Sequence, residues 1–442
     1  MLEKKSILLI YAEGMYDSSI LATKEYIEST NADCYVIAIS DKELRSFKSA
    51  QIKRWIYTNC IRNWPFMHGL LFTLSRINTR HKINSTKHEL KEYKIPEEAV
   101  SKWFYKITEK YRRVYNIIRR FAPDVILCAD PSLLNKVCKA VHNAKLINTT
   151  ITALITDYVL DERFVNYRVD KFYVQNQGVL GKLRSYGIDS EKLEIIGTPI
   201  SEKSIKSQDI SEIRKEFGIA NNNPNIVIIG GRYGSSKIKD AFTAMMELNT
   251  DINIVVYTTN SVSLNKFCAV LAKSKQKEKT TFLVEYLDDI SKLYALADII
   301  ITCPTASITY EIMCINRGMI LCKGSNRIEK QNAHYLISNG CALSGQSIDE
   351  LIASLGLLLG NDEHLMETFA NQNAIVSTND IVNLSDSLLE IATTNYNKKK
   401  ELYAKRNKVA NLSKKQDTKL TKPNDDNEIM QEDKENELWL ST

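Results

Sequence analysis

The second half of the chain has polar residues suited to chemistry directly after apolar segments. Gly230 and Gly231 follow the segment NIVII, where glycine lets the backbone approach a phosphate closely and the next helix offers free N–H groups. The same glycines would also suit a strand-to-helix turn with no ligand. This motif alone therefore leaves phosphate binding and a plain turn equally open.

Two further groups follow later apolar segments. After ADIIIT, residues 297–302, come the hydroxyls of Ser307 and Thr309 and, about one helical turn on, the carboxylate of Glu311. If these loops lie at strand carboxyl ends, hydroxyls and carboxylate face the same crevice as Gly230, an arrangement that suits a ribose diphosphate. Gln331 and Asn332, which follow GMILCKG, could bond sugar hydroxyls. Each group alone is more often a solvated loop.

In the first half, carboxylates stand where strands are expected to end. Asp17, Asp130 and Asp157 each fall in a loop that would face a cleft between the two halves. A carboxylate there could deprotonate a hydroxyl if desolvation raised its pKa. We choose Asp157 as the candidate base because it ends a strongly apolar strand. A helix cap or an ordinary loop carboxylate explains this residue equally well.

Alternating strands and helices must position these residues. Apolar strand-sized segments separated by helical spacing recur through both halves, at 6–12, 34–40, 123–130, 144–158 and 170–177 and then from Asn225 onward. Such alternation is typical of parallel, doubly wound sheets. The sequence therefore predicts an α/β protein with two such halves and a boundary near residues 198–222.

We expect three segments along the chain. Residues 1–200 and 201–394 form the two α/β domains, and residues 395–442 form a charged tail. Residues 398–422 carry ten Lys and Arg against two acids, and residues 423–437 carry seven acids against one Lys. Almost nothing there could form a core, so the composition predicts a disordered tail.

The composition excludes several classes of protein. With 442 residues, 44% of them hydrophobic and 25% charged, the chain resembles an ordinary globular protein, and no run approaches the roughly 20 apolar residues of a spanning helix. The apolar run near the N-terminus is too short for a signal peptide and predicts a first strand. Nine Cys without C-x-x-C spacing and six dispersed His indicate a reduced compartment and no metal site.

The basic charge is concentrated in one segment. Residues 42–120 hold 19 Lys and Arg against 6 Asp and Glu, while the rest of the chain is net acidic. Trp55, Trp64 and Trp103 are interleaved with these charges. A basic, aromatic face could meet an anionic membrane surface or nucleic acid. No nucleic-acid recognition motif accompanies it, so we expect the membrane and no nucleic acid.

From about residue 5 to about residue 390 the sequence resembles the monogalactosyldiacylglycerol synthase and processive diacylglycerol glucosyltransferase family. The most specific stretch is VDKFYVQNQGVLGKLRSYGIDSEKLEIIGTPI, residues 169–200, and others are residues 286–304 and Gln331-Asn332-Ala333. The resemblance implies the GT-B fold, in which two Rossmann-like, doubly wound domains face an interdomain cleft. Residues 1–200 would then face the acceptor and membrane, and residues 201–394 would bind the nucleotide-sugar.

The resemblance also implies an activity. Such enzymes are inverting hexosyltransferases that use a UDP-sugar as co-substrate and act on a membrane lipid or lipid-linked acceptor. They need no metal or further cofactor in the site, and they work at the cytoplasmic face of the membrane with which they associate peripherally. The residues implied in donor binding are Gly230 and Gly231 for the diphosphate, Tyr286 and Leu287 for uracil, Ser307 and Thr309 for the phosphates, Glu311 for ribose, and Gln331 with Asn332 for the hexose.

This sequence departs from the family in its first half. Ser19 stands where the family has a histidine implicated in catalysis, and Asp130 stands where the family often has another histidine. A serine cannot accept a proton near neutral pH unaided, so Ser19 could only orient the acceptor while Asp157 acts as base. Two hypotheses follow: an active transferase, and a degenerate GT-B protein that binds a nucleotide-sugar without transferring it. A nucleic-acid binder and a sugar-nucleotide epimerase have less support.

Overall fold

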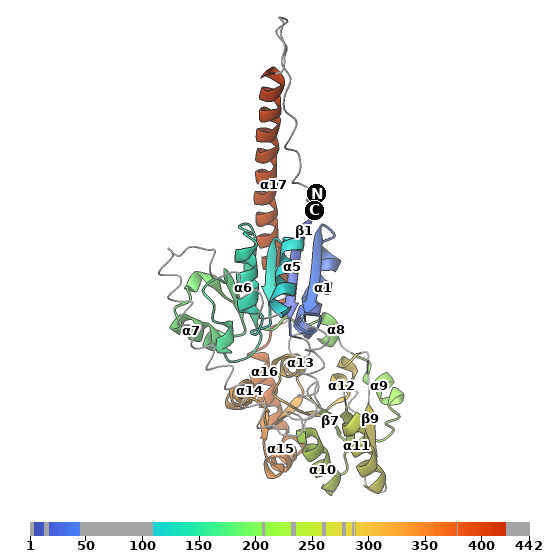
Figure 1. Ribbon diagram of the computed structural model, residues 1–442. Helices are drawn as coiled ribbons and strands as arrows, with labels where there is room; N and C mark the ends of the chain where they lie inside the picture. Colours follow the sequence, from blue (N-terminus) through green and yellow to red (C-terminus); the bar gives the residue numbers. More distant parts are fainter. Residues whose placement is uncertain are drawn as a thin grey trace, which may run out of the picture. The chain divides into compact units, whose positions relative to one another are not determined.

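We describe the protein from a computed structural model (Figure 1). It describes residues 4–12, 17–44, 109–205, 208–230, 236–258, 262–275, 280–284, 287, 289–377 and 379–420. Most of the basic segment 42–120 lies outside these ranges, as do Gly231 and Tyr286.

The first half of the chain forms a sheet of six parallel strands in the order β2-β1-β3-β4-β5-β6. Its strands are rich in Val, Ile and Leu, as expected where helices cover both faces of a parallel sheet. The strands are β1 (Lys5–Tyr11), β2 (Cys34–Ser40), β3 (Val125–Cys128), β4 (Thr150–Ile155), β5 (Lys171–Val174) and β6 (Leu193–Ile195). The helices of this half are α1 (Asp17–Thr30), α5 (Glu109–Phe121), α6 (Leu134–Asn143) and α7 (Gln177–Ser185), with short 3-10 turns at Glu162–Phe164 and Ser190–Lys192.

Helices of this half pack on opposite faces of the sheet. Ile20 and Ile27 of α1 lie in one apolar cluster, with alternate residues of β1 and β3. Val137 of α6 and Leu183 of α7 lie in a second cluster, with the other set of strand residues. Because β1 leads through α1 to β2 on one side and β3 leads through α6 to β4 on the other, the strand order reverses between β1 and β3.

The second half forms another sheet of six parallel strands, in the order β12-β11-β10-β7-β8-β9. Here the order reverses between β7 and β10. The strands are β7 (Asn225–Ile229), β8 (Asn253–Tyr257), β9 (Thr280–Val284), β10 (Ile299–Thr302), β11 (Gly318–Cys322) and β12 (Leu343–Gly345). The helices are α8 (Glu202–Ile205), α9 (Ile210–Glu216), α10 (Ser236–Glu247), α11 (Val262–Lys275), α12 (Ser291–Leu296), α13 (Ala306–Cys314), α14 (Arg327–Ser338), α15 (Ile348–Gly360) and α16 (Asp362–Asn373).

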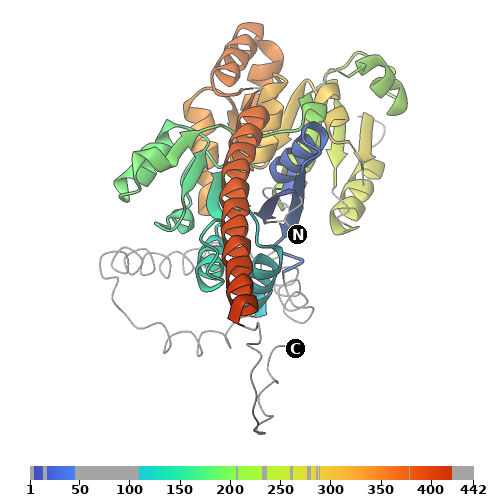
Figure 2. The ribbon, with the colours of Figure 1, turned by 90° about the horizontal axis from the view of Figure 1, so that it is seen from above.

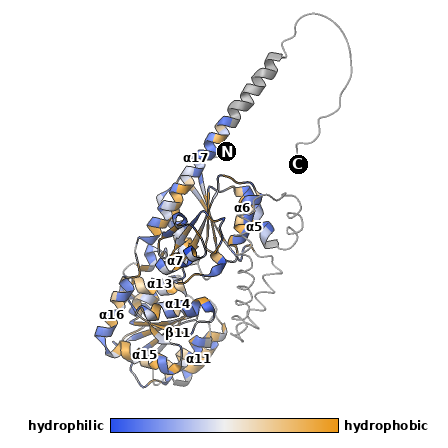
Figure 3. Ribbon diagram, turned by 90° about the vertical axis from the view of Figure 1, so that its left-hand side faces the viewer, coloured by the Kyte–Doolittle hydropathy of each residue, from blue (hydrophilic) through white to orange (hydrophobic). Residues whose placement is uncertain are grey.

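The predicted pair of doubly wound, Rossmann-like halves is confirmed. Both sheets are wholly parallel, and each has its own helices. Helices such as α6 and α15 show both hydrophobic and hydrophilic residues in Figure 3, as expected of helices with one buried face. Among the described residues, no helix is both long and apolar enough to cross a membrane.

The start of α17 (Asp380–Leu420) returns to the first sheet after the second half is complete (Figure 2). Leu384, Leu388 and Ala392 pack in the same apolar cluster as β1 and β3, and Asn395 Nδ2 donates to the carbonyl of Asp124 at 2.9 Å. We expected residues up to 394 to belong to the second domain. Helical spacing does not show which sheet a helix covers. The sequence pattern therefore assigns this segment to the second domain, which precedes it in the chain.

The tail also differs from the expectation of disorder from residue 395. Helix α17 extends to Leu420, and residues Asn397–Thr442 form a separate unit from Met1–Tyr396. Residues 401–405 are exposed, so no core holds these five residues. The Lys, Glu, Ala, Leu and Gln residues here have high intrinsic helix propensity, which a search for core-forming periodicity does not register.

Asp380, the first residue of α17, holds a junction between the two halves. Its carboxylate accepts from the backbone N–H of Thr198 at 3.1 Å and from the hydroxyl of Tyr310. Gly197 has a φ of +85°, and a Cβ there would overlap the Asp380 carboxylate, so this turn requires glycine. Burial raises the pKa of Asp380 to about 6, although these hydrogen bonds oppose the shift.

This raised pKa predicts a pH dependence that Asp380→Asn should remove. A carboxyl group whose pKa is raised on folding stabilises the protein below its unfolded pKa, and this stabilisation is lost as pH rises through the folded value. Between pH 4 and 7 the free energy of unfolding of the wild type should therefore fall, relative to the variant, by up to about 3 kcal/mol. Urea unfolding at pH 4.5, 5.5 and 7 measures it. Parallel pH curves for the two proteins would contradict the prediction.

Candidate functional site

The two predicted donor loops begin side by side, where the strand order of the second sheet reverses. Strand β7 ends at Ile229 beside Thr302, the last residue of β10. The Thr302 hydroxyl donates to the Ile229 carbonyl at 3.0 Å, and the buried Gly230 follows directly. In open α/β sheets ligands bind at the carboxyl edge at such a reversal. The structure thus places Gly230 and the start of α13 at one candidate site.

The N-terminus of α13 can bind an anion. Its cap residue, Thr305, makes no side-chain capping bond, so no capping side chain satisfies the N–H groups of the first turn. These groups and the helix dipole favour negative charge, such as a phosphate. Ser307 lies in this first turn and is buried. These features fit the predicted phosphate-binding role.

Glu311 lies one turn further along α13 and is buried. Its Oε2 accepts a hydrogen bond from the hydroxyl of Tyr294 at 2.9 Å. Tyr294 is itself fully buried on α12, and burial together with the Glu311 carboxylate raises its pKa well above the usual range. Tyr294 therefore stays protonated and keeps donating to Glu311, which fixes the carboxylate. No pattern around Tyr294 in the sequence predicts this role.

Asn332 and Asp157, predicted for separate roles in separate halves, are hydrogen-bonded to each other. Asn332 Nδ2, on α14, donates to Asp157 Oδ1 at 2.9 Å and to the Pro304 carbonyl at 3.4 Å. Its Oδ1 accepts from the backbone N–H of Tyr158 at 3.2 Å. The loop after β4 in the first half is thereby joined to the donor loops of the second.

Tyr158 continues this connection with its ring. The side chain is 1% exposed and belongs to an apolar core cluster of the second half, although the residue follows β4 of the first. Its ring stacks on Tyr335 with centroids 5.2 Å apart, and its hydroxyl lies 3.0 Å from Thr309 Oγ1. Thr309, predicted to contact phosphate, thus has Tyr158 as a neighbour. We call Asp157, Tyr158 and Asn332 the bridge.

A second polar group lies where the strand order of the first sheet reverses. The Ala129 N–H donates to the Ile10 carbonyl at 2.8 Å, so Asp130 begins beside the end of β1. Asp130 and Ser19 are both buried. The structure does not describe the side chain of Asp17. Of the three carboxylates predicted for proton transfer, Asp130 and Asp157 therefore have a described position.

Four other residues are predicted to bind the sugar donor. Leu287 is half-buried against an apolar cluster of the second half, and Gln331 is half-buried on α14 next to Asn332. Gly231 and Tyr286 lie outside the described residues, so their predicted contacts with diphosphate and uracil stay predictions.

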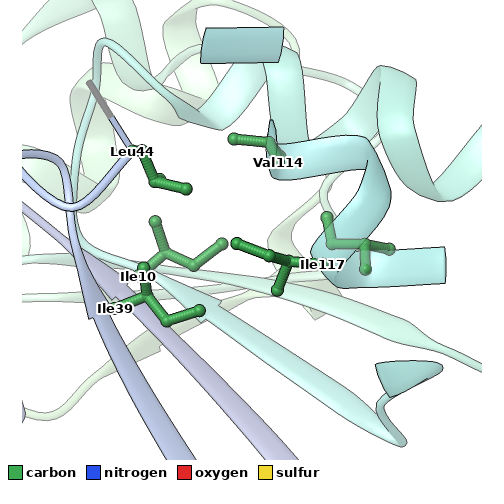
Figure 4. Close-up of a pocket in the computed structure, with 6 residues that line it drawn as sticks. Ile10, Ile39, Leu44, Val114 and Ile117 are labelled. Carbon is green, nitrogen blue, oxygen red and sulfur yellow. The ribbon is translucent and has the colours of Figure 1, made fainter. Parts of the chain in front are cut away.

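Two pockets elsewhere contain none of the predicted site residues. One is lined only by aliphatic side chains of β1, β2, α5 and Leu44, which point toward one another in Figure 4. It offers no polar group to bind or react with a sugar. The other lies near the starts of α10 and α15, with Lys237, Asp240 and Ser347 among its lining residues. We therefore locate the candidate site from the strand-order reversals and the bridge, and not from these pockets.

Comparison with known proteins shows which family this chain resembles. Residues 18–200 match the model of the family described as monogalactosyldiacylglycerol (MGDG) synthase. The predicted family resemblance is confirmed. A curated relative, the processive diacylglycerol beta-glucosyltransferase of Bacillus pumilus, is 23% identical over 340 residues, which are 74% of this chain and 87% of the relative.

Solved structures show the same GT-B architecture. MurG of Acinetobacter baumannii has a TM-score of 0.56 and 13% identity, over 87% of this chain and 99% of its own. The UDP-GlcNAc 2-epimerase of Neisseria meningitidis, bound to UDP-GlcNAc, has a TM-score of 0.57 and 12% identity, over 87% of this chain and all of its own. At such identities the likeness shows the fold alone, and the function must be argued from the site.

Proposed function

We propose that the protein transfers a hexose from a UDP-sugar to a membrane lipid or lipid-linked acceptor, with inversion at the anomeric carbon. The observation that carries the proposal is the uncapped N-terminus of α13 beside Gly230, with Glu311 one turn on. This arrangement suits a nucleoside diphosphate. The lipid acceptor is proposed because the Bacillus relative, matched over most of its length, is named as a diacylglycerol glucosyltransferase.

The donor would lie at the carboxyl edge of the second sheet. We assign the diphosphate to Gly230, Gly231 and the first turn of α13 with Ser307, and the ribose to Glu311. Uracil would meet the backbone at Tyr286 and Leu287. Gln331 and Asn332 would contact the hexose, with Asp157 holding the Asn332 amide in position through their 2.9 Å hydrogen bond.

In the reaction the acceptor hydroxyl oxygen bonds to the anomeric carbon while the bond from that carbon to the diphosphate oxygen breaks. UDP leaves with negative charge on the diphosphate, where the N–H groups of α13 stabilise it without a metal. The hydroxyl proton passes to a carboxylate at the edge of the first sheet. The alternative is binding without transfer. The missing family histidine does not favour it, because Asp130 and Asp157 can still accept the proton.

We propose that the protein works at the inner face of the cell membrane, where it binds peripherally to anionic lipid. Helix α5 supports this, since it belongs to the basic segment and has two different faces. Val114 and Ile118 are buried, while Arg112, Arg119 and Arg120 are exposed. Exposed arginines on one helix attract anionic headgroups, and the attraction weakens with salt.

UDP should bind to the wild type, and Glu311→Ala should weaken that binding. A hydrogen bond to a charged group contributes about 1.5–3 kcal/mol, so the dissociation constant should rise by about one to two orders of magnitude. Titration calorimetry with UDP measures it. Tyr294→Phe is the matched control, because it keeps the carboxylate and removes only the hydroxyl that orients it, so its effect should be smaller. Equal UDP affinity in wild type and Glu311→Ala would contradict the ribose assignment.

The protein should sediment with anionic vesicles at low salt and less so at high salt. Replacing Arg112, Arg119 and Arg120 together by glutamine should weaken this binding by up to about 1 kcal/mol for each charge. Lys182→Gln with Arg184→Gln on α7 is a control that also removes exposed charge. Equal sedimentation with neutral and anionic vesicles at every salt concentration would refute the membrane proposal.

A further inference from the structure

The carboxyl edge of the first sheet contains buried polar atoms that the fold leaves without hydrogen-bond partners. They include Asp130 Oδ2 and the Oγ atoms of Ser18 and Ser19. Asp130 is 2% exposed and Ser19 is fully buried. A buried carboxylate oxygen without a partner is costly, and native proteins satisfy nearly all such atoms. Its presence here points to a ligand that satisfies it.

These atoms lie where ligands bind in open α/β sheets. Ser18 and Ser19 are in the first turn of α1, which follows β1, and Asp130 follows the neighbouring β3, which ends at Cys128. Helix α1 covers one face of the sheet and α6 the other, so the connections diverge at this point. Such divergence opens a crevice outside the carboxyl ends of the strands.

The backbone holds the Asp130 carboxylate in a fixed position. Its Oδ1 accepts from the N–H of Ser132 at 2.7 Å, and its carbonyl accepts from the N–H groups of Leu133 and Leu134 at 3.0 and 3.1 Å. The backbone thus holds Oδ1 in place, while the buried Oδ2 has no hydrogen-bond partner. Asp157 differs, because neither of its oxygens is among the buried atoms without a partner, and its Oδ1 accepts from Asn332 in the bridge.

We propose that Asp130 is the base of the transfer reaction and that the Ser19 hydroxyl forms a hydrogen bond with the acceptor oxygen. This inference rests on the proposed function. As the acceptor oxygen forms its bond to the anomeric carbon and the bond to the diphosphate breaks, the hydroxyl proton moves to Asp130 Oδ2. The serine hydroxyl cannot take this proton but can orient the oxygen that loses it.

The test compares Asp130→Asn and Asp130→Ala with the wild type in the full chain, and Asp189→Asn is a control for an exposed aspartate. Transfer is measured with UDP-glucose and vesicles that contain diacylglycerol, UDP affinity by calorimetry, and melting temperature without ligand. In Asp130→Asn, transfer should fall by about 10²–10⁴-fold with UDP affinity unchanged. Formate should restore part of the rate in Asp130→Ala, because it replaces the lost carboxylate.

The melting temperature separates this proposal from the proposed function. Asparagine keeps the bond from Ser132 and removes an unpaired buried charge, so Asp130→Asn should melt at the wild-type temperature or above it. A lower melting temperature would show that Asp130 is structural and overturn the proposal, even if the wild type transferred no sugar. Wild-type transfer rates in Asp130→Asn would overturn it as well, and a rate lost in Asp157→Asn instead would assign the base to Asp157.

Discussion

Replacing Tyr158 by alanine is expected to lower the free energy of unfolding by about 3–5 kcal/mol. The side chain is 1% exposed in the core of the half opposite to its own strand, so its removal leaves a cavity there and breaks the stacking on Tyr335. Calorimetric unfolding should show a melting temperature lower by several degrees.

Tyr158→Phe is the matched control for this result. It keeps the ring and its stacking, and it removes only the hydroxyl that lies 3.0 Å from Thr309 Oγ1. A neutral hydrogen bond contributes about 0.5–1.5 kcal/mol, so this variant should lose far less stability. If Tyr158→Ala and Tyr158→Phe melt at the same temperature, the ring does not anchor one half in the other.

The second large effect is expected at the hydrogen bond between Asp157 and Asn332. Asp157→Ala leaves the Asn332 amide without its carboxylate partner, and Asn332→Ala leaves the buried carboxylate without its amide donor. Each variant should lose about 1.5–3 kcal/mol of stability, because the bond is buried and charge-assisted. The double variant should lose less than the sum of the two, with a coupling of about 0.5–3 kcal/mol. Urea unfolding of the four proteins measures this coupling.

If the stability losses of Asp157→Ala and Asn332→Ala simply add in the double variant, the two residues do not stabilise the protein through their hydrogen bond. Transfer assays on the same four proteins then show how the bridge bears on catalysis. If Asp157 only positions Asn332, Asn332→Ala and Asp157→Ala should slow transfer to a similar degree. A much larger loss in Asp157→Ala would favour the role of base that the sequence predicted for it.

The strands and the donor loops could be predicted from the sequence because local patterns specify them. Continuous Val, Ile and Leu runs such as Ile226–Ile229 are typical of strands buried on both faces, and the residues after them must lie at the carboxyl edge. This reasoning predicts the positions of Gly230 and Ser307. These positions follow from the order of elements along the chain and need no knowledge of side-chain contacts.

The bridge and the return of α17 could not be predicted, because they depend on contacts between distant residues. Tyr158 is separated from Thr309 by 151 positions, and nothing near Tyr158 indicates that its ring enters the second half. Leu384 and Leu388 show helical spacing that suits either sheet. The lack of a hydrogen-bond partner at Asp130 Oδ2 likewise depends on how its neighbours pack and not on its place in a motif.

The most direct test of the central claim is sugar transfer itself. Purified full-length protein is incubated with radiolabelled UDP-sugars and membrane lipid vesicles that contain diacylglycerol, and the lipid fraction is analysed for labelled glycolipid. We predict labelled glycolipid from at least one UDP-hexose and its loss when UDP is added in excess. If UDP binds but no UDP-sugar yields labelled lipid or free labelled hexose, the protein is not a transferase of this kind.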